Sequence, residues 1–439
     1  LIPKTERYIG MKKEGSTEVE IESTFKQKRP MTIFTHAGEK DTLMTPLDSL
    51  KYYIKILNAG FVAMEQSSGK IKAWVGGVDY AHFKYDHVRS KRQVGSTFKP
   101  IVMAAALEEG YTPCDYFSND HIVYSQYDNW EPQNSDNTYG GLYSMEGTLV
   151  HSVNCAAVDA IIQLGSKPVI DMAKRLGIQS SLPSVPSLAL GTADISLMEM
   201  VQAFSVFPNK GMKNKPYYLR KIENNKGEVI VDFEKDLPPA ENILSEVNAQ
   251  LMTQMLKSVA ESGTARSLKS AYSIGSEVGA KTGTTQNQSD GWLIGFTPKL
   301  TFGAWVGGEM PTIRFRSLDL GQGSYMALPI CGSFLQKMNA NKSLKKFQGG
   351  SFPALSDEAM SMLGCPYYIE EEYDETLVAD NLAPADSMMT VPVSRHRVDT
   401  INNIKNRKRE RRKEGGGIGG FLERLFKKKE KPVDAEDHR

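Results

Sequence analysis

The chain has 439 residues, of which 40% are hydrophobic, and its formal net charge is +1 at pH 7. This length suffices for two or three domains, and the composition is that of a globular protein with a core large enough for an enzyme. The near-neutral charge predicts no nucleic-acid binding by the body of the protein, and no run of residues approaches the length of a membrane span.

The four cysteines are widely spaced and include no Cys-x-x-Cys pair: Cys114, Cys155, Cys331 and Cys365. They predict neither a zinc site nor a dense disulfide framework, and they leave the redox compartment open. The chain starts at Leu1 without a signal peptide, and we expect it to be a fragment whose N-terminal part is missing.

Residues 1–57 are polar and favour β-structure. The segments 17–21 and 31–34 alternate between polar and apolar residues, as half-exposed strands do. We expect a linker or a small accessory region here, without a catalytic set. Residues 59–65 and 70–77 then flank a turn that contains glycine, which predicts a β-hairpin.

Residues 101–110 form an apolar run with a glycine at its end, which predicts a short helix with Gly95 and Ser96 at its start. Pro100 is compatible with the first turn, because the first N–H groups of a helix have no intrahelical partner. Ser96 and Lys99 are three residues apart, so a single turn brings a hydroxyl and an amine onto one face. A weak nucleophile beside a base, at the positive end of a helix, is what acyl transfer requires.

A loop rich in turn-forming residues follows at 128–134. Residues 144–165 then show a mixed helical pattern that includes Ser152 and Asn154, two residues apart. In a continuous helix these side chains would point apart, whereas a loop or a broken helix could aim both into one cleft.

A second helical segment is expected at 194–207, with Asp194 as its cap and a stripe of Met and Phe in the core. A helix at 328–338 is expected to pack on a sheet. Alternating and apolar runs predict the antiparallel strands of that sheet at residues 279–285, 290–296 and 300–307, with a turn at 297–299.

Beyond about residue 345 the pattern weakens. The acidic run 370–375 is expected to be a solvated loop. The tail is basic at 405–413 and again at 421–429, after a glycine-rich joint, and is typical of a disordered segment. Docking to an anionic membrane surface is the functional alternative for this tail.

Three sparse elements stand in chain order: Ser96-x-x-Lys99, Ser152-x-Asn154 and Lys281-Thr282-Gly283. This ordered set resembles the motifs of the penicillin-recognising serine acyltransferases, which include penicillin-binding proteins and serine β-lactamases. Over roughly residues 45–340 the chain is similar to the transpeptidase domain of class A penicillin-binding proteins. The segments that carry this likeness are 72–77, 92–100, 188–191, 281–285, 290–292 and 327–330.

The resemblance implies that Ser96 attacks the carbonyl of a D-alanyl-D-alanine terminus, releases D-alanine and leaves an ester. Lys99 would accept the serine proton as a neutral amine, a form that desolvation and the nearby charge of Lys281 both favour. Ser152, held in place by Lys281, would relay a proton to the departing amine. The implied catalytic residues are Ser96, Lys99, Ser152 and Lys281.

The same resemblance implies a strand that binds the substrate. Glycine in this strand would let an extended peptide approach and pair with it. Thr282 and Thr285 would offer hydroxyls to the terminal carboxylate, and Asn154 would hold the substrate's peptide group. The backbone N–H groups of Ser96 and Thr284 would form the oxyanion hole. The implied substrate-binding residues are Asn154, Thr282, Gly283, Thr284 and Thr285.

The implied function is that of a peptidoglycan D,D-transpeptidase, which cross-links stem peptides through an acyl-enzyme and is inhibited covalently by penicillins. No metal and no cofactor are implied. The partners would be stem peptides, lipid-linked precursor or glycan strands, β-lactam antibiotics and, through the basic tail, a membrane surface, but no nucleic acid. The parent protein would also carry a glycosyltransferase domain and lie on the outer face of the bacterial cytoplasmic membrane.

Related activities remain as alternatives. A serine β-lactamase shares the three elements, but the Glu-x-x-Leu-Asn pattern of class A lactamases is absent between Ser152 and Lys281, and class C lactamases carry Tyr in place of Ser-x-Asn. A D,D-carboxypeptidase, which uses water as acceptor, stays open. So does a penicillin-sensing domain that is acylated without turnover.

The expected fold class is α+β, with an antiparallel sheet flanked by helices, a mostly helical subdomain and a small β-leaning N-terminal region. We expect a linker or accessory region at residues 1–57 and a penicillin-binding transpeptidase domain at 58–345. A C-terminal extension is expected at 346–400 and a basic tail at 401–439.

Overall fold

The computed structural model describes residues 2–370. The predictions for the basic tail at 401–439, and for the acidic run 370–375 apart from Glu370, lie outside the described residues. Among residues 2–370, no helix is long and apolar enough to cross a membrane.

A five-stranded antiparallel sheet forms the centre of the larger body, in the order β13-β14-β15-β3-β4. Its strands are β3 (Asn58–Glu65), β4 (Lys70–Val75), β13 (Gly279–Thr284), β14 (Asp290–Phe296) and β15 (Thr301–Gly307). The predicted hairpin and the three predicted later strands are therefore confirmed. Because β15 pairs with β3, the two ends of this domain meet in the middle of its sheet.

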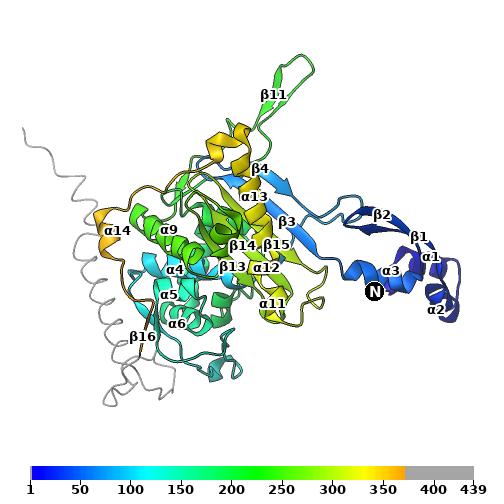
Figure 1. The fold of residues 1–439 in the computed structure, drawn as a ribbon, viewed down its shortest axis with the longest axis horizontal. Helices are drawn as coiled ribbons and strands as arrows, with labels where there is room; N and C mark the ends of the chain where they lie inside the picture. Colours follow the sequence, from blue (N-terminus) through cyan, green and yellow to red (C-terminus); the bar gives the residue numbers. More distant parts are fainter. Residues whose placement is uncertain (1, 371–439) are drawn as a thin grey trace, which may run out of the picture.

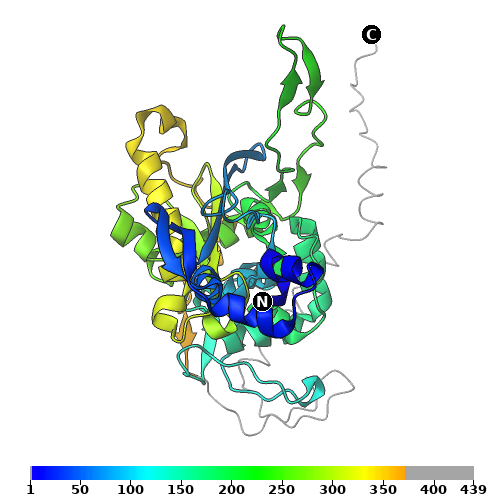
Figure 2. The same cartoon turned by 90° about the vertical axis from the view of Figure 1, so that its right-hand side faces the viewer.

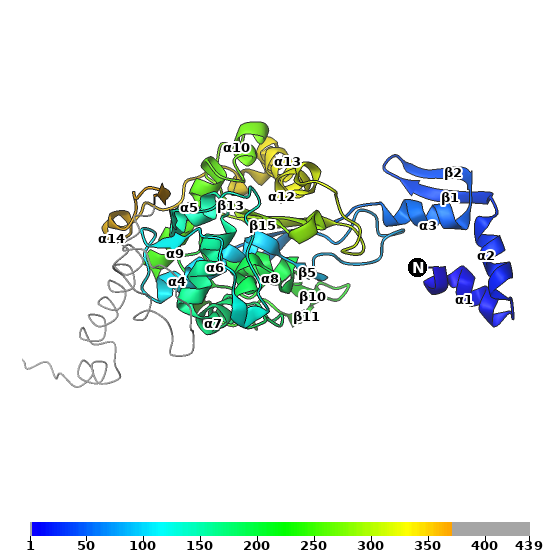
Figure 3. The same ribbon diagram turned by 90° about the horizontal axis from the view of Figure 1, so that it is seen from below.

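Helices cover both faces of the sheet. Neighbouring residues of β15 point to opposite faces, so the partners of Phe302 and Gly303 show what covers each one. The ring of Phe302 lies 6.2 Å from that of Phe334 in α13 (Leu328–Ala340), the helix predicted at 328–338. On the other face, a side chain at Gly303 would collide with Leu197 and Val201 of α8. The sheet is thus the middle layer between α13 and a helical subdomain (Figures 1 and 3).

The helical subdomain surrounds α4, whose residues are buried from Lys99 to Leu107. A short helix that is buried on all sides belongs to a core rather than to a surface. The helices of this subdomain are α4 (Lys99–Glu108), α5 (Met145–Val150), α6 (Asn154–Leu164), α7 (Ser166–Leu176), α8 (Leu197–Ser205) and α9 (Glu246–Glu261).

The predicted helix start at Asp194 is wrong. Asp194 begins the short strand β8 (Asp194–Ser196), which pairs with β5 (Lys91–Gln93) just before the Ser96 turn. Ser196 caps α8 instead, because its hydroxyl accepts the N–H of Glu199 and the Glu199 carboxylate accepts the N–H of Ser196.

The N-terminal region lies beside the larger body, joined to it by the chain that leads into β3 (Figure 3). The strand predicted at 31–34 is confirmed within β1 (Arg29–Thr35), which pairs with β2 (Gly38–Met44). The strand predicted at 17–21 is wrong: Thr17 and Glu20 form a capping box that starts a helix, and Ile21 and Phe25, four apart, are its buried face. The helices here are α1 (Glu6–Lys13), α2 (Glu18–Lys26) and α3 (Pro46–Ile54).

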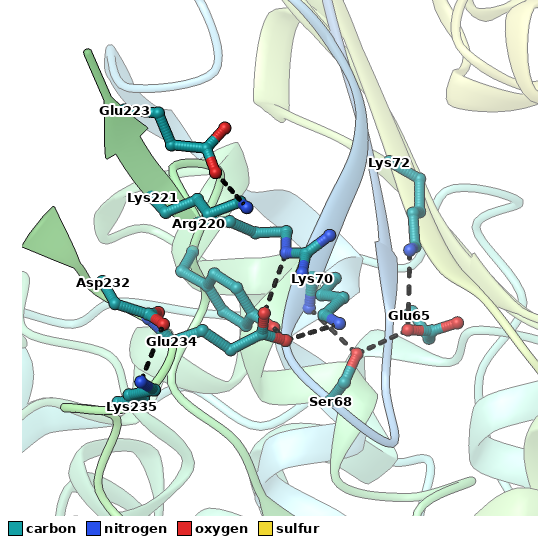
Figure 4. Close-up of polar contacts among 11 residues, drawn as sticks. Glu65, Ser68, Lys70, Lys72, Arg220, Lys221, Glu223, Asp232, Glu234 and Lys235 are labelled. Carbon is teal, nitrogen blue, oxygen red and sulfur yellow. Dashed lines mark hydrogen bonds and ion pairs between the residues drawn. The ribbon is translucent and has the colours of Figure 1, made fainter. Parts of the chain in front are cut away.

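A two-stranded arm, β10 (Lys221–Glu223) with β11 (Val229–Asp232), projects from the body (Figures 1 and 2). Its base is fixed by Glu234, whose carboxylate pairs with Lys70 Nζ at 2.6 Å and Arg220 Nε at 2.8 Å (Figure 4). These contacts join the arm to the start of β4.

A disulfide joins Cys114, after α4, to Cys365 in the C-terminal strap, residues 351–369. The strap ends in β16 (Tyr368–Ile369), which adds to the small sheet of β7 (Leu142–Ser144) and β6 (Tyr116–Ser118). The remaining elements are η1 (Ile2–Lys4), η2 (Gly95–Phe98), η3 (Ser125–Tyr127), η4 (Pro186–Leu190), η5 (Gln286–Gln288), η6 (Lys342–Phe347), β9 (Met212–Lys213), β12 (Glu241–Asn242), α10 (Ser267–Tyr272), α11 (Leu318–Gly321), α12 (Gly323–Met326) and α14 (Asp357–Ser361).

Candidate active site

Ser96 lies in the 3-10 turn η2, directly before α4 begins at Lys99. The turn depends on Gly95, which has a φ of +54° and whose missing side chain would lie 2.6 Å from the carbonyl oxygen of Thr284. Only glycine allows this backbone conformation and this close approach together. Ser96 is half-buried, and it occupies the turn before the helix rather than its cap.

The strand β13 lies against this turn. A side chain at Gly283 would sit 2.6 Å from the carbonyl oxygen of Val94 and 2.9 Å from Thr97 Cγ2. The absence of a side chain at 283 therefore admits the Ser96 turn. This differs from the expected reason for the glycine, which was the approach of a substrate peptide.

Ser152 and Asn154 lie at a break between two helices. This is the broken helix that the sequence allows as an alternative to a continuous one. Helix α5 ends at Val150, Ser152 has a φ of +59°, and α6 begins at Asn154. The left-handed residue between the helices turns the chain so that both side chains face the lysine of α4.

One hydrogen-bonded network joins the three motifs. Lys99 Nζ lies 2.7 Å from Asn154 Oδ1 and 3.3 Å from Ser152 Oγ, and it also lies within hydrogen-bond distance of the carbonyl oxygen of Ser152. Lys281 Nζ donates to Ser152 Oγ at 2.8 Å. Segments that are distant in sequence therefore meet around the Ser152 hydroxyl. Among the described residues, no side chain hydrogen-bonds to the Ser96 hydroxyl.

Both lysines of the network are completely buried. Burial, and then the nearby charge of Lys281, lower the pKa of Lys99 well below its ordinary value. Burial lowers the pKa of Lys281 to about 7. A buried ammonium group loses its hydration, so both sites favour the neutral amine.

The threonines of the third motif have partners within the protein. Thr282 Oγ1 donates to Thr264 Oγ1 at 2.6 Å, and Thr284 Oγ1 accepts the N–H of Gly323 at 3.1 Å. Thr285 is buried, and its hydroxyl accepts the N–H of Asp290 at 3.0 Å. The Thr285 hydroxyl therefore stabilises the turn into β14 in this structure.

Arg92 and Asp290 have a positioning role that motif reasoning missed. Arg92 Nε pairs with Asp290 Oδ1 at 2.7 Å, with side chains 14% and 3% exposed. The same carboxylate oxygen accepts Trp305 Nε1 at 3.0 Å, and Trp292 Nε1 donates to the carbonyl of Gln93 at 2.8 Å. These bonds tie the segment before Ser96 to β14 and β15. The only sequence signal was that these residues stand in the segments similar to class A penicillin-binding proteins.

Asn134 was also missed, because the segment 128–134 was interpreted only as a loop of turn-forming residues. Its side-chain oxygen accepts the N–H of Asn154 at 2.8 Å. Within residues 2–370, no group of His, Cys, Asp and Glu side chains is arranged to hold a metal ion.

Residues 59–308 match the family described as "Penicillin binding protein transpeptidase domain", and residues 1–57 match "Penicillin-binding protein middle domain". The first match covers more than half of the chain. The chain therefore belongs to the penicillin-binding protein transpeptidase family, and its domain is a serine-type D,D-transpeptidase of the class that forms peptidoglycan cross-links and binds penicillins. The predicted family and the predicted transpeptidase class of the domain are confirmed.

The curated relatives are penicillin-binding proteins 1A. The protein of Aquifex aeolicus is 34% identical over 278 residues, which are 62% of this chain and 37% of the relative. That of Rickettsia bellii is 32% identical over 303 residues, 64% of this chain and 38% of the relative. The chain thus spans less than two fifths of the length of these relatives.

Solved structures share the fold. Penicillin-Binding Protein 1A from Haemophilus influenzae has a TM-score of 0.60 at 24% identity, covering 71% of this chain and 50% of that one. The penicillin-binding protein PonA1 from Mycobacterium tuberculosis also has a TM-score of 0.60, at 22% identity, covering 73% and 86%. At these identities the likeness concerns the fold alone, and it confirms the predicted α+β class with its central antiparallel sheet.

Proposed function

We propose that Ser96 is the nucleophile of the transpeptidase reaction and that Lys99, Ser152 and Lys281 move its protons. The observation that carries the proposal is the network in which two fully buried lysines share the Ser152 hydroxyl. One of them, Lys99, lies three residues after Ser96, where the turn η2 passes into α4. Two lysines with lowered pKa values beside two serines form a chain of groups that can each accept or donate a proton.

In the acylation step, the Ser96 oxygen bonds to the carbonyl carbon of the penultimate D-alanine while its proton passes to Lys99. The peptide C–N bond then breaks, and Ser152 protonates the departing D-alanine nitrogen. Ser152 regains its proton through Lys99 and Lys281, both within hydrogen-bond distance of its oxygen. The products are a serine ester and free D-alanine. The Ser96 proton has moved to the D-alanine nitrogen, and Lys99, Ser152 and Lys281 have returned to their starting protonation.

The second step reverses the proton path. An amine from a neighbouring stem peptide attacks the ester and loses a proton to the network. The Ser96 oxygen leaves and takes that proton back. A new amide bond cross-links two peptides, and these steps use only side chains and substrate.

The position of β13 supports binding of an extended peptide. β13 is an edge strand of the sheet, so one side of its backbone is available to pair with another strand. We propose Asn154, Thr282, Gly283, Thr284 and Thr285 as the substrate-binding set. To bind the substrate carboxylate, the hydroxyl of Thr282 must then give up its bond to Thr264, and the hydroxyl of Thr285 its bond from the N–H of Asp290.

We also propose the division into residues 1–57, 58–345, 346–400 and 401–439. The family matches at 1–57 and 59–308 support the first boundary. The relatives are longer than this chain, and the match covers only 37% and 38% of their lengths, which supports a parent protein with a further glycosyltransferase domain. The Cys114–Cys365 disulfide favours an oxidising compartment, and with the family it supports the outer face of the cytoplasmic membrane.

The partners proposed are stem peptides with lipid-linked precursor or glycan strands, β-lactam antibiotics and, through the basic tail, a membrane surface. The family match favours this reaction over the β-lactamase and penicillin-sensing alternatives. The carboxypeptidase alternative differs only in using water as the acceptor.

Mass spectrometry after exposure to a penicillin tests the proposal. We expect one covalent adduct per chain on the peptide that holds Ser96, slow to hydrolyse and absent from Ser96→Ala. An adduct that persists in Ser96→Ala contradicts the assignment, and rapid drug turnover favours a β-lactamase. With a D-alanyl-D-alanine peptide and an amine acceptor, a cross-linked product distinguishes the transpeptidase from a carboxypeptidase.

A further inference from the structure

The end of α6 that faces Lys99 is capped from outside the helix. Its N-cap residue, Val153, makes no side-chain cap, although the first backbone N–H groups of a helix have no intrahelical partner. Asn134 supplies the missing acceptor. Its Oδ1 accepts the N–H of Asn154 at 2.8 Å and that of Cys155 at 3.2 Å.

Asn134 is held in one orientation. It is only 7% exposed, and its Nδ2 donates to Asn119 Oδ1 at 2.6 Å and to the carbonyl of Thr138 at 2.7 Å. An amide oxygen accepts and an amide nitrogen donates, so partners on both ends decide which way the group faces. Two accepted and two donated bonds use the whole hydrogen-bonding capacity of this buried side chain.

The residue before Asn134 orients Asn154. The carbonyl of Gln133 accepts Asn154 Nδ2 at 2.7 Å, which leaves Asn154 Oδ1 facing Lys99 Nζ at 2.7 Å. A neutral amine has two N–H donors and one lone pair. The two shorter contacts, with Asn154 Oδ1 and the carbonyl of Ser152, use both donors, so the 3.3 Å contact with Ser152 Oγ is not a donated bond in this form. The lone pair then remains to accept a hydroxyl proton.

We propose that Asn134 is a positioning residue for acyl transfer, because it caps α6 and thereby fixes Asn154, which aims the Lys99 amine. This inference rests on the proposed role of Lys99 as the base for Ser96. Asn134 touches neither the nucleophile nor the amine, so it acts only through Asn154.

The test follows acylation of the full 439-residue chain by a fluorescent penicillin. It separates the acylation rate constant from the dissociation constant of the noncovalent complex and counts the adducts per chain. The variants are Asn134→Ala, Asn134→Asp, Asn154→Ala, the double alanine variant and a control, Ser135→Ala, an exposed position in the same loop.

Asn134→Ala is expected to lower the acylation rate constant roughly 10- to 100-fold, because small misplacements of a catalytic group are costly. The noncovalent dissociation constant should rise by a smaller factor than the rate constant falls, since binding uses Asn154 but not the Lys99 lone pair. Asn134→Asp keeps an acceptor for both helix N–H groups but places its second oxygen against the oxygens of Asn119 and Thr138. It should therefore lose less of the rate than Asn134→Ala does. In the Asn154→Ala background, Asn134→Ala should lower the rate by less than about threefold more.

The proposal is overturned if Asn134→Ala acylates as fast as Ser135→Ala, or if the two alanine substitutions have additive effects. A purely structural defect lowers the number of adducts per chain and leaves the rate constant unchanged, which also overturns it. If Asn134→Ala does not fold, Asn134→Asp is compared in the wild-type and Asn154→Ala backgrounds. An unchanged rate, or a loss that nearly disappears without Asn154, supports the proposal, and an additive loss overturns it. Failure of the proposed function is distinct, because the wild-type chain would then take no adduct or Ser96→Ala would keep one.

Discussion

At the scale of single residues, the reactivity of Lys99 is set by its surroundings. The side chain is completely buried, and its pKa lies well below the ordinary lysine value because of desolvation and the charge of Lys281. A base is useful only when it is unprotonated at the working pH, so the buried position is part of the chemistry. Burial of a side chain that cannot lose its proton would not produce a base.

We therefore expect Lys99→Arg to lower the acylation rate by roughly 100-fold or more, because a guanidinium group stays protonated in proteins. Lys99→Met, which has a similar length and no base, should lose as much. The measurement is acylation by a fluorescent penicillin at fixed pH. Lys167→Arg on the exposed face of α7 serves as the control, since that side chain is 85% exposed. Acylation of Lys99→Arg at the wild-type rate would exclude Lys99 as the base.

Lys281 predicts a dependence of stability on pH. Burial lowers its pKa from 10.5 to about 7, so between these values the unfolded chain binds a proton at this site and the folded chain does not. The free energy of unfolding rises with pH wherever the unfolded state binds more protons. The contribution of Lys281 is thus least favourable below pH 7 and increases as the pH rises towards 10.5.

Urea denaturation of the wild type and of Lys281→Met, at several pH values across this window, measures the effect. The wild-type free energy of unfolding should rise relative to that of the variant as the pH rises. Taking the difference removes the titrating groups that do not interact with Lys281. The charge of Lys281 also lowers the pKa of Lys99, and this coupling changes the difference in the same direction. A difference that is independent of pH, or one that falls, contradicts the low pKa.

At the scale of elements, the Arg92–Asp290 pair connects β5 to β14. We expect Arg92→Gln to lower the free energy of unfolding by about 3–5 kcal/mol, because it leaves a buried carboxylate without its partner. Arg92→Lys should recover only part of this loss, since one ammonium group cannot also reach the carbonyl of Gly308. Urea denaturation measures both variants, with the exposed neighbour Lys91→Gln as control. Equal stability of Arg92→Gln and Lys91→Gln would contradict this role.

The disulfide fixes the C-terminal strap to the helical subdomain. It joins cysteines 251 positions apart, and a long closed loop gives a large entropic stabilisation. Reduction should lower the free energy of unfolding by about 2–5 kcal/mol. The same reductant should leave a Cys114→Ser/Cys365→Ser double variant unchanged, which separates loss of the disulfide from other effects of the reagent. A wild-type chain whose thermal midpoint does not respond to reductant argues against the bond.

The elements that could be predicted from sequence are those whose local pattern agrees with their environment. β14, β15 and α13 combine apolar runs with clear turn signals, and they were placed correctly. The 17–21 segment alternates like a strand, but it forms a helix. The helix is favoured by its capping box and by the four-residue spacing of its buried residues, Ile21 and Phe25. A two-residue period over five residues is weaker than a cap, and this explains the error.

The candidate site shows a similar division. The motif residues were predicted because their types and order are distinctive, and the network joins Lys99, Ser152, Asn154 and Lys281. Asn134 and Asp290 could not be assigned a role, because their partners lie far away in sequence and only folding brings them together. Nothing in local spacing distinguishes a turn-forming asparagine from one that caps a distant helix.

At the scale of the whole molecule, the N-terminal region contacts the transpeptidase domain through the loop between β4 and β5. The ring of Phe83 lies 5.4 Å from that of Phe34 and 6.3 Å from that of Tyr53, and His82 Nε2 lies 3.3 Å from Glu39 Oε1. The same loop continues into β5 and then into the Ser96 turn. The relative position of the two regions therefore depends on a small aromatic contact.

Phe83→Ala removes both aromatic pairs, each worth about 0.5–1.5 kcal/mol, so the contact should open more often. Trypsin cleavage after Lys55, an exposed residue at the end of α3, should then become roughly tenfold faster, because proteolysis follows the population of the open form. Tyr85→Ala, an exposed aromatic in the same loop, is the control and should leave cleavage unchanged. Acylation by a penicillin should continue in both variants, since the network around Ser152 contains no residue of this contact. Equal cleavage rates in the two variants would show that Phe83 does not hold the regions together, and loss of acylation in Phe83→Ala alone would show that the contact also positions the Ser96 turn.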